Sequence, residues 1–228
     1  MSKTKSRRKR RIVVSIIAGF FFVVALAIVV PFGILGLRTN HLNKDYGYLK
    51  TDETYSQKVE VTGINLVTQH VSCGYASIEM MSEYYGFKVT EDDLNAKNNG
   101  GVSTSSTSGF LNEINASIKD QDFIKRTYLT NDDYLKEIHN ALAKNNPVAI
   151  EWAAKFEDEW TLHFSVVTSM DLGNDQIVVY NPYGYIETLH SDEFLERTTF
   201  KAYKSLPLFL NFGFAFGAFD KNALFYAI

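Results

Sequence analysis

The chain has 228 residues, of which 46% are hydrophobic and 21% are charged, and its formal net charge at pH 7 is −3. The first 38 residues hold eight basic residues and no acidic one, so the rest of the chain carries 15 basic and 26 acidic residues, a net charge of −11. A domain this acidic has no electrostatic reason to bind nucleic acid, and we expect no nucleic-acid partner. Its roughly 190 residues are enough for one domain with a substantial core.

The N-terminus predicts a membrane anchor. Residues 1–11 include seven basic side chains, and residues 12–37 contain no charge at all. At about 1.5 Å per residue in a helix, this uncharged run is long enough to cross a hydrocarbon core of about 30 Å. We therefore expect residues 12–37 to contact the lipid bilayer as a single transmembrane helix. The basic segment 1–11 then lies in the cytoplasm by the positive-inside rule, and the rest of the chain lies outside the cell.

A cleaved signal peptide is the alternative, because Ala25-Leu26-Ala27 resembles a small-x-small cleavage site. The apolar run continues from Ile28 to Leu37, which favours an uncleaved anchor. The polar residues 38–58 predict an extracellular stalk, and residues 59–228 predict the folded domain. An exposed domain without a disulfide is typical of a bacterial surface of the Gram-positive type.

The first half of the domain reads as mainly helical. Apolar residues at 3- and 4-residue spacing and N-cap residues such as Thr90 mark the helices. The pattern predicts an entry strand over Val59–Val67 and helices over Tyr75–Tyr85, from Thr90 onward, over Phe110–Ile118 and over 131–144.

The second half is rich in β-forming residues. Short strands are expected over Val148–Ala153, Leu162–Met170 and Gln176–Tyr180, followed by a short helix over Ser191–Arg197. Helices followed by a mostly antiparallel sheet predict an α+β fold.

The tail from Leu206 to Ile228 is aromatic. Phe212, Phe214 and Phe216 alternate with small residues, and a hairpin turn over residues 220–222 is expected before a final strand, Leu224–Ile228. A second membrane span is the alternative, but the run from Leu206 to Phe219 contains Asn211 and has only 14 residues, which is too short to cross a bilayer.

Cys73, the only cysteine, stands at the start of the Tyr75–Tyr85 helix. It has no partner for a disulfide within the chain, and the positive end of a helix dipole favours a thiolate. A nucleophile is useful in that position. The competing interpretation is a small buried side chain that only packs.

A cysteine nucleophile needs a base, which is usually a histidine oriented by a third polar group. His163 opens an apolar strand and is the best candidate among five histidines. Asn181 ends the next strand, and an antiparallel neighbour would place it beside the start of the His163 strand. Its side-chain oxygen can then accept the imidazole N–H. The sequence Asn181-Pro182-Tyr183-Gly184 is also a plain turn signal.

Together these blocks resemble the papain-like cysteine peptidases of the C39-like group. The resemblance rests on Cys73-Gly74-Tyr75-Ala76-Ser77, on His163-Phe164-Ser165-Val166-Val167 and on Asn181-Pro182-Tyr183-Gly184, in the family's order. It implies a papain-like fold with Cys73 as nucleophile, His163 as general base and then acid, and Asn181 as orienting residue. The family usually has aspartate where this chain has Asn181.

The resemblance also implies a glutamine that donates to the oxyanion. Gln69 is the candidate, but it stands four residues before Cys73, whereas six is more usual, and Val67 occupies that place. The implied activity is hydrolysis of peptide bonds through a thioester, with a peptide or protein as substrate. We expect no cofactor and no metal in this chemistry.

The sequence is also compatible with two other functions. An anchored domain outside the cell could act on peptidoglycan as an amidase or endopeptidase. The unusual spacing of Gln69 also fits a catalytically silent papain-like domain that binds peptides or a partner protein.

Overall fold

The computed structural model describes residues 2–228, with their side chains from residue 14 onward. The chain divides into two compact units, one ending at Arg38 and the other spanning Thr39–Ile228. The first is a single helix, α1 (Ser2–Thr39), which runs through Pro31 without a break. Its stretch Val14–Thr39 is long and apolar enough to cross a membrane, a test that a signal sequence near the N-terminus also passes.

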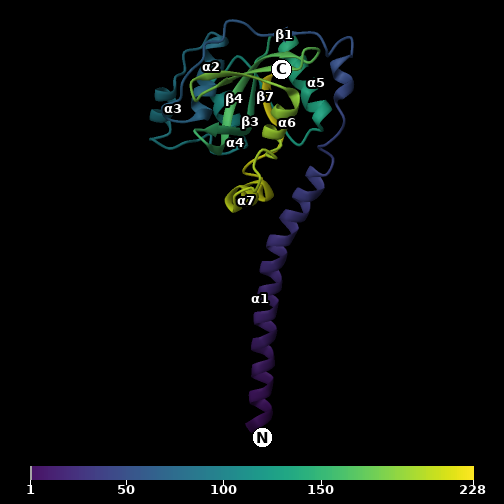
Figure 1. Cartoon of the computed structure of the whole chain (residues 1–228). Helices are drawn as coiled ribbons and strands as arrows, with labels where there is room; N and C mark the ends of the chain where they lie inside the picture. Colours follow the sequence, from purple (N-terminus) through teal and green to yellow (C-terminus); the bar gives the residue numbers. More distant parts are fainter. Residues whose placement is uncertain (1) are drawn as a thin grey trace. The chain divides into compact units, whose positions relative to one another are not determined.

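The second unit is built on one antiparallel sheet of seven strands within the described residues (Figure 1). The order is β2-β7-β3-β4-β5-β6, and β1 pairs with β4 beside this path. The strands are β1 (Val59–Glu60), β2 (Phe123–Arg126), β3 (Val148–Phe156), β4 (Glu159–Asp171), β5 (Gln176–Asn181), β6 (Tyr185–Leu189) and β7 (Ala223–Ala227). The helices are α2 (Cys73–Tyr84), α3 (Glu91–Lys97), α4 (Thr107–Ser117), α5 (Asn131–Ala143), α6 (Ser191–Thr198) and α7 (Leu208–Phe216), with a 3₁₀ turn at Gly47–Lys50.

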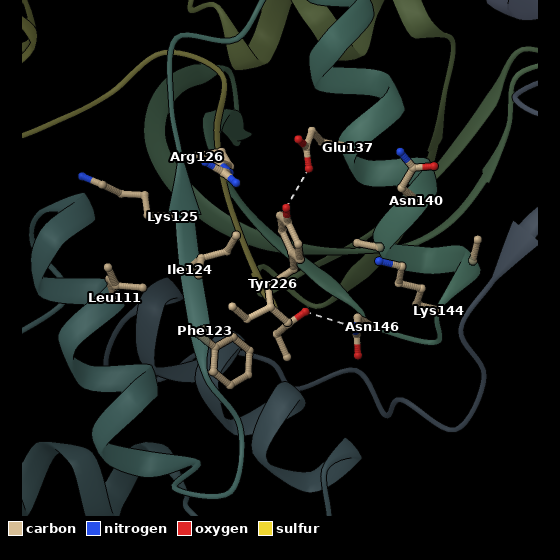
Figure 2. A pocket seen from close by; sticks show the side chains of 14 residues that line it. Leu111, Phe123, Ile124, Lys125, Arg126, Glu137, Asn140, Lys144, Asn146 and Tyr226 are labelled. Atoms are coloured by element: carbon tan, nitrogen blue, oxygen red, sulfur yellow. Dashed lines mark hydrogen bonds between the residues drawn. The ribbon is translucent and has the colours of Figure 1, made fainter.

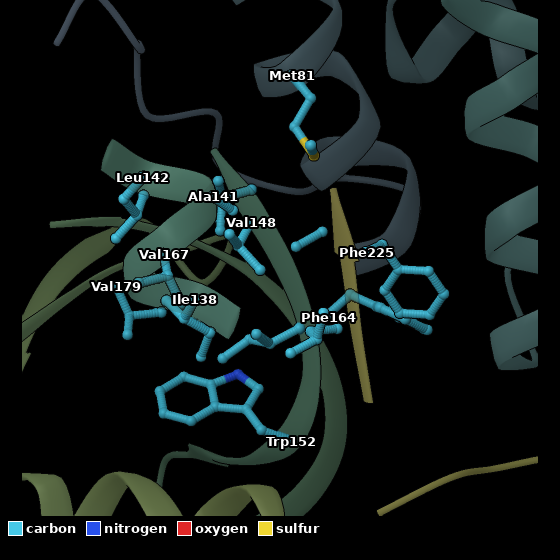
Figure 3. Close-up of a cluster of buried hydrophobic side chains, with 14 of the residues drawn as sticks. Met81, Ile138, Ala141, Leu142, Val148, Trp152, Phe164, Val167, Val179 and Phe225 are labelled. Atoms are coloured by element: carbon cyan, nitrogen blue, oxygen red, sulfur yellow. The ribbon is translucent and has the colours of Figure 1, made fainter. Parts of the chain in front are cut away.

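Helices cover both faces of this sheet. Trp152 on β3 lies opposite His163 on β4, and Phe164 points to the other face because successive strand residues alternate. The ring of Phe164 stacks on Phe110 of α4 with centroids 4.4 Å apart, whereas Trp152 packs near Phe194 of α6 at 6.4 Å. The buried side chains between these layers form one apolar core (Figure 3). The predicted α+β architecture is confirmed.

Residues 38–58 differ from the expected stalk. Leu42 and Leu49 are buried, and Leu49 belongs to the main core cluster. The backbone N–H of Asn131 donates to Leu42 O over 2.8 Å. The segment therefore packs on the domain, because isolated leucines in a polar stretch find apolar partners that are distant in sequence.

The aromatic tail forms a helix, so the turn expected over residues 220–222 does not join two strands. α7 buries Leu210 and Phe214, which are four residues apart and share one helix face. It ends at Gly217, whose φ of +75° is the left-handed conformation that glycine adopts without strain. The final strand is present as β7, and it pairs with both β2 and β3.

Candidate active site

Cys73 is the first residue of α2. Ser72 caps the helix, since its side-chain oxygen accepts the backbone N–H of Tyr75 over 3.2 Å. The cysteine is half-buried and unpaired. Burial raises the pKa of its thiol to about 11, and the nearby backbone N–H of Phe164 only partly opposes this rise. The helix N-terminus was expected to favour a thiolate, but loss of water outweighs it, so the thiol is neutral at pH 7.

His163 and Asn181 meet as the strand pairing predicts. β4 and β5 are antiparallel neighbours, and His163 Nε2 lies 2.9 Å from Asn181 Oδ1. Because an amide oxygen only accepts, the imidazole carries its proton on Nε2 and leaves Nδ1 with a free lone pair. His163 is 1% exposed, and burial lowers its pKa to about 3 despite the hydrogen bond to Asn181. The imidazole is therefore a neutral acceptor at pH 7.

Asn181 is held in one orientation by its own partners. Its Oδ1 also accepts the backbone N–H of Tyr183 over 2.9 Å, and its Nδ2 donates to Glu187 Oε1 over 2.8 Å. Glu187 in turn accepts from Arg197 of α6 over 2.7 Å. The Arg197 guanidinium lies 5.0 Å from the centre of the Trp152 ring. Glu187 and Arg197 are functional candidates that sequence reasoning missed, because nothing in the sequence marks their contacts, although Glu187 is only six residues after Asn181.

Cys73 lies next to the strand that carries His163. The Cys73 side chain is beside the backbone N–H of Phe164, the residue that follows His163. The Tyr183 ring stacks on the His163 ring with centroids 4.0 Å apart, and burial raises the pKa of its hydroxyl, with Cys73 contributing. Within the residues whose side chains are described, no hydrogen bond joins Cys73 to His163. The structure thus brings all three candidate residues into one region, with a resting neutral thiol.

Gln69 lies against the turn that follows Asn181. Its backbone N–H donates to Pro182 O over 2.8 Å. Its neighbour Thr68 packs so closely on the turn that a Cβ added at Gly184 would lie 3.1 Å from the threonine oxygen. The Oε1 atom of Gln69 is buried and has no hydrogen-bond partner among the described residues. The shorter sequence spacing therefore still brings this glutamine to the edge of the site.

Glu91 supports the loop before the nucleophile, a role that its place in the sequence did not reveal. This fully buried carboxylate accepts the backbone N–H of His70 over 2.8 Å and that of Ser72 over 3.0 Å. His70 Nδ1 also lies 2.6 Å from it, and the carboxylates of Glu91 and Asp92 raise the pKa of this imidazole, Asp92 foremost. From the sequence, Glu91 was only an acid in the first turn of a helix.

The remaining histidines have other partners. His41, His139 and His190 each contact a backbone carbonyl, of Tyr128, Gln57 and Asp175 respectively. A cavity of about 880 Å³ also lies between β2, β7 and α5, and its lining includes Tyr226, which donates to Glu137 (Figure 2). None of Cys73, His163 and Asn181 lines that cavity.

Comparison with known protein families matches residues 54–206 to the Peptidase_C39 like family. The match covers about two thirds of the chain and includes Cys73, His163 and Asn181. The chain belongs to this family, and its helices and antiparallel sheet have the corresponding papain-like fold. No curated protein matches the chain.

Proposed function

We propose that the protein is a membrane-anchored cysteine peptidase whose catalytic domain lies outside the cell. In this proposal Cys73 is the nucleophile, His163 is the base and then the acid, and Asn181 orients the imidazole. The observation that carries it is the 2.9 Å contact from His163 Nε2 to Asn181 Oδ1, which leaves Nδ1 as an acceptor, while the Cys73 side chain lies beside the backbone N–H of the next residue, Phe164. The uncharged stretch in α1 supports the anchor, and the basic residues before it support the orientation.

The chemistry follows from two neutral partners. The thiol proton moves to His163 Nδ1 as Sγ bonds to the peptide carbonyl carbon, so no free thiolate is needed in the closed site. The oxyanion that forms is stabilised by the Cys73 backbone N–H at the start of α2 and by the Gln69 side-chain amide. His163 then gives its proton to the leaving amine as the C–N bond breaks. Water, deprotonated by His163, cleaves the thioester and restores the thiol.

Each group carries part of this chemistry. Loss of one oxyanion donor typically lowers the rate on the order of 10²–10³-fold, so Gln69→Ala should reduce turnover without abolishing it. Asn181→Ala should cost more than a simple hydrogen bond, because the imidazole would lose the partner that selects its tautomer.

The test uses the full chain in lipid nanodiscs, incubated with a peptide library and followed by mass spectrometry. Wild type is expected to cleave peptides, while Cys73→Ser and His163→Ala are inactive. His190→Ala is the matched control, since this exposed histidine lies outside the site and should keep full activity. Equal cleavage by wild type and Cys73→Ser would refute the proposal. Release of muropeptides from purified peptidoglycan, with no peptide cleavage, would replace it with the wall-hydrolase function.

A catalytically silent binding domain is the second candidate. The observation that favours it is the loss of water around both side chains, which raises the pKa of the thiol and lowers that of the imidazole. Alkylation by iodoacetamide in the presence of peptides separates the two. The peptidase proposal expects Cys73 to react faster in wild type than in His163→Ala. Identical rates, together with peptide binding, would establish the silent domain.

A further inference from the structure

α7 presents an apolar face that the domain does not cover. Leu208, Phe209 and Phe216 are 71%, 67% and 60% exposed. Leu210 and Phe214, on the opposite face of the helix, are buried. Monomeric soluble proteins rarely leave large apolar side chains together on one exposed face, and such a face marks an interaction site. With nine residues, α7 is too short to cross a bilayer.

The helix is fixed firmly to the domain. The Phe214 ring packs edge-on against Phe200 with centroids 4.8 Å apart, and Lys221 Nζ lies 5.5 Å from the centre of the same ring. Phe219 covers Gly213 so closely that an added Cβ would lie 2.2 Å from the ring. The exposed face therefore points outward from a rigid support, and it cannot fold back into the core.

The residues that hold α7 in place lie beside the first residues of the domain. The Lys201 side chain donates to Asn43. Lys221 O accepts the backbone N–H of Tyr128 over 2.8 Å, and Tyr128 O contacts His41 Nε2 over 2.9 Å. The apolar stretch of α1 ends at Thr39, two residues before His41. Two residues of extended chain span at most about 7 Å. If the membrane boundary is at Thr39, chain connectivity therefore keeps the residues that hold α7 near it.

The charges around α7 suit a lipid surface. Residues 199–219 contain two lysines, Lys201 and Lys204, and no acid, although the domain as a whole carries a net charge of −11. Aromatic and leucine side chains flanked by lysines are typical of helices that lie in the headgroup region of a bilayer. We propose that α7 inserts its exposed face into the membrane that holds α1 and thereby docks the domain on the lipid surface. This inference rests on the proposed anchor.

The test places a fluorescent label at single cysteines in the full chain, in a Cys73→Ser background. The positions are Phe209→Cys on the exposed face of α7, Ile186→Cys on β6 as the matched exposed apolar control, and Val23→Cys within α1. Each protein is reconstituted as a single copy in nanodiscs, and quenching by nitroxide lipids is compared with quenching by iodide in water. Fluorescence of Trp152 and Trp160 checks that each variant is folded.

The label at position 209 is expected to be quenched several-fold more by nitroxide lipids than the label at 186, and several-fold less by iodide. Equal iodide quenching at 209 and 186 would overturn the inference. Protection of 209 from both quenchers would also overturn it, because a protein surface then covers α7. Iodide quenching at Val23 would show that the anchor itself is wrong, whereas the peptidase assay is read independently of all three labels.

Discussion

The protonation of His163 gives the sharpest physical prediction. Its pKa is about 3 in the folded protein, and an exposed histidine in the unfolded chain has a pKa of about 6.5. Below pH 6.5 the unfolded chain therefore binds a proton that the folded protein does not, so acid destabilises the fold. Linkage gives about 1.4 kcal/mol for each unit of pKa difference, and between pH 7.5 and 4.5 this one group contributes a loss of about 2.5 kcal/mol.

The perturbation that isolates this loss is His163→Gln. Urea unfolding in detergent, followed by the fluorescence of Trp152 and Trp160, gives the free energy of unfolding at each pH. Wild type should lose about 2.5 kcal/mol more than the variant between pH 7.5 and 4.5. Just above pH 7.5 the imidazole is neutral in both the folded and the unfolded state. There the free energies of unfolding of the two proteins should change with pH in parallel. Equal losses in acid would refute a buried, neutral His163.

Three further changes test the surroundings of the site. Glu91→Gln should lower the free energy of unfolding by about 2–4 kcal/mol and reduce kcat, because two backbone N–H groups lose a charged acceptor. Urea unfolding and peptide cleavage measure these two effects. A loss of stability below about 0.5 kcal/mol would contradict this prediction. Gly74→Ala should lower the free energy of unfolding by about 1–3 kcal/mol, because the new Cβ would lie 2.3 Å from Thr104 Oγ1. A second change, Thr104→Gly, should restore most of this stability in urea unfolding. If it restores none, the clash is not the cause. Tyr183→Ala should admit water to the His163 ring and raise the pKa of the imidazole toward 6.5. NMR titration of His163 measures this pKa, and an unchanged value would refute the prediction.

The contact between His163 and Asn181 could be predicted from the sequence because it depends on local rules. Two short β-rich runs joined by a turn pair as antiparallel neighbours, and the end of one strand then lies beside the beginning of the other. The capping of α3 by Thr90 is equally local, and the predicted cap is present with both of its hydrogen bonds.

Contacts between residues that are far apart in the sequence could not be predicted from local patterns. The alternation of Phe212, Phe214 and Phe216 is compatible with a strand or a helix, and burial of Leu210 with Phe214 selects the helix. Leu49 looked like part of a stalk until the core that receives it was assembled. Glu91 likewise reveals its contact with the Cys73 loop only when α3 is packed beside α2.

In the proposed reaction, Cys73 attacks a peptide carbonyl with His163 as its base. The most direct measurement is mass spectrometry of the full chain, quenched with acid while it turns over a cleaved peptide. We predict a thioester adduct on the peptide that contains Cys73, present in wild type and missing from His163→Ala. Turnover without any adduct on Cys73, or the same adduct level in both proteins, would show that Cys73 is not the nucleophile or that His163 is not its base.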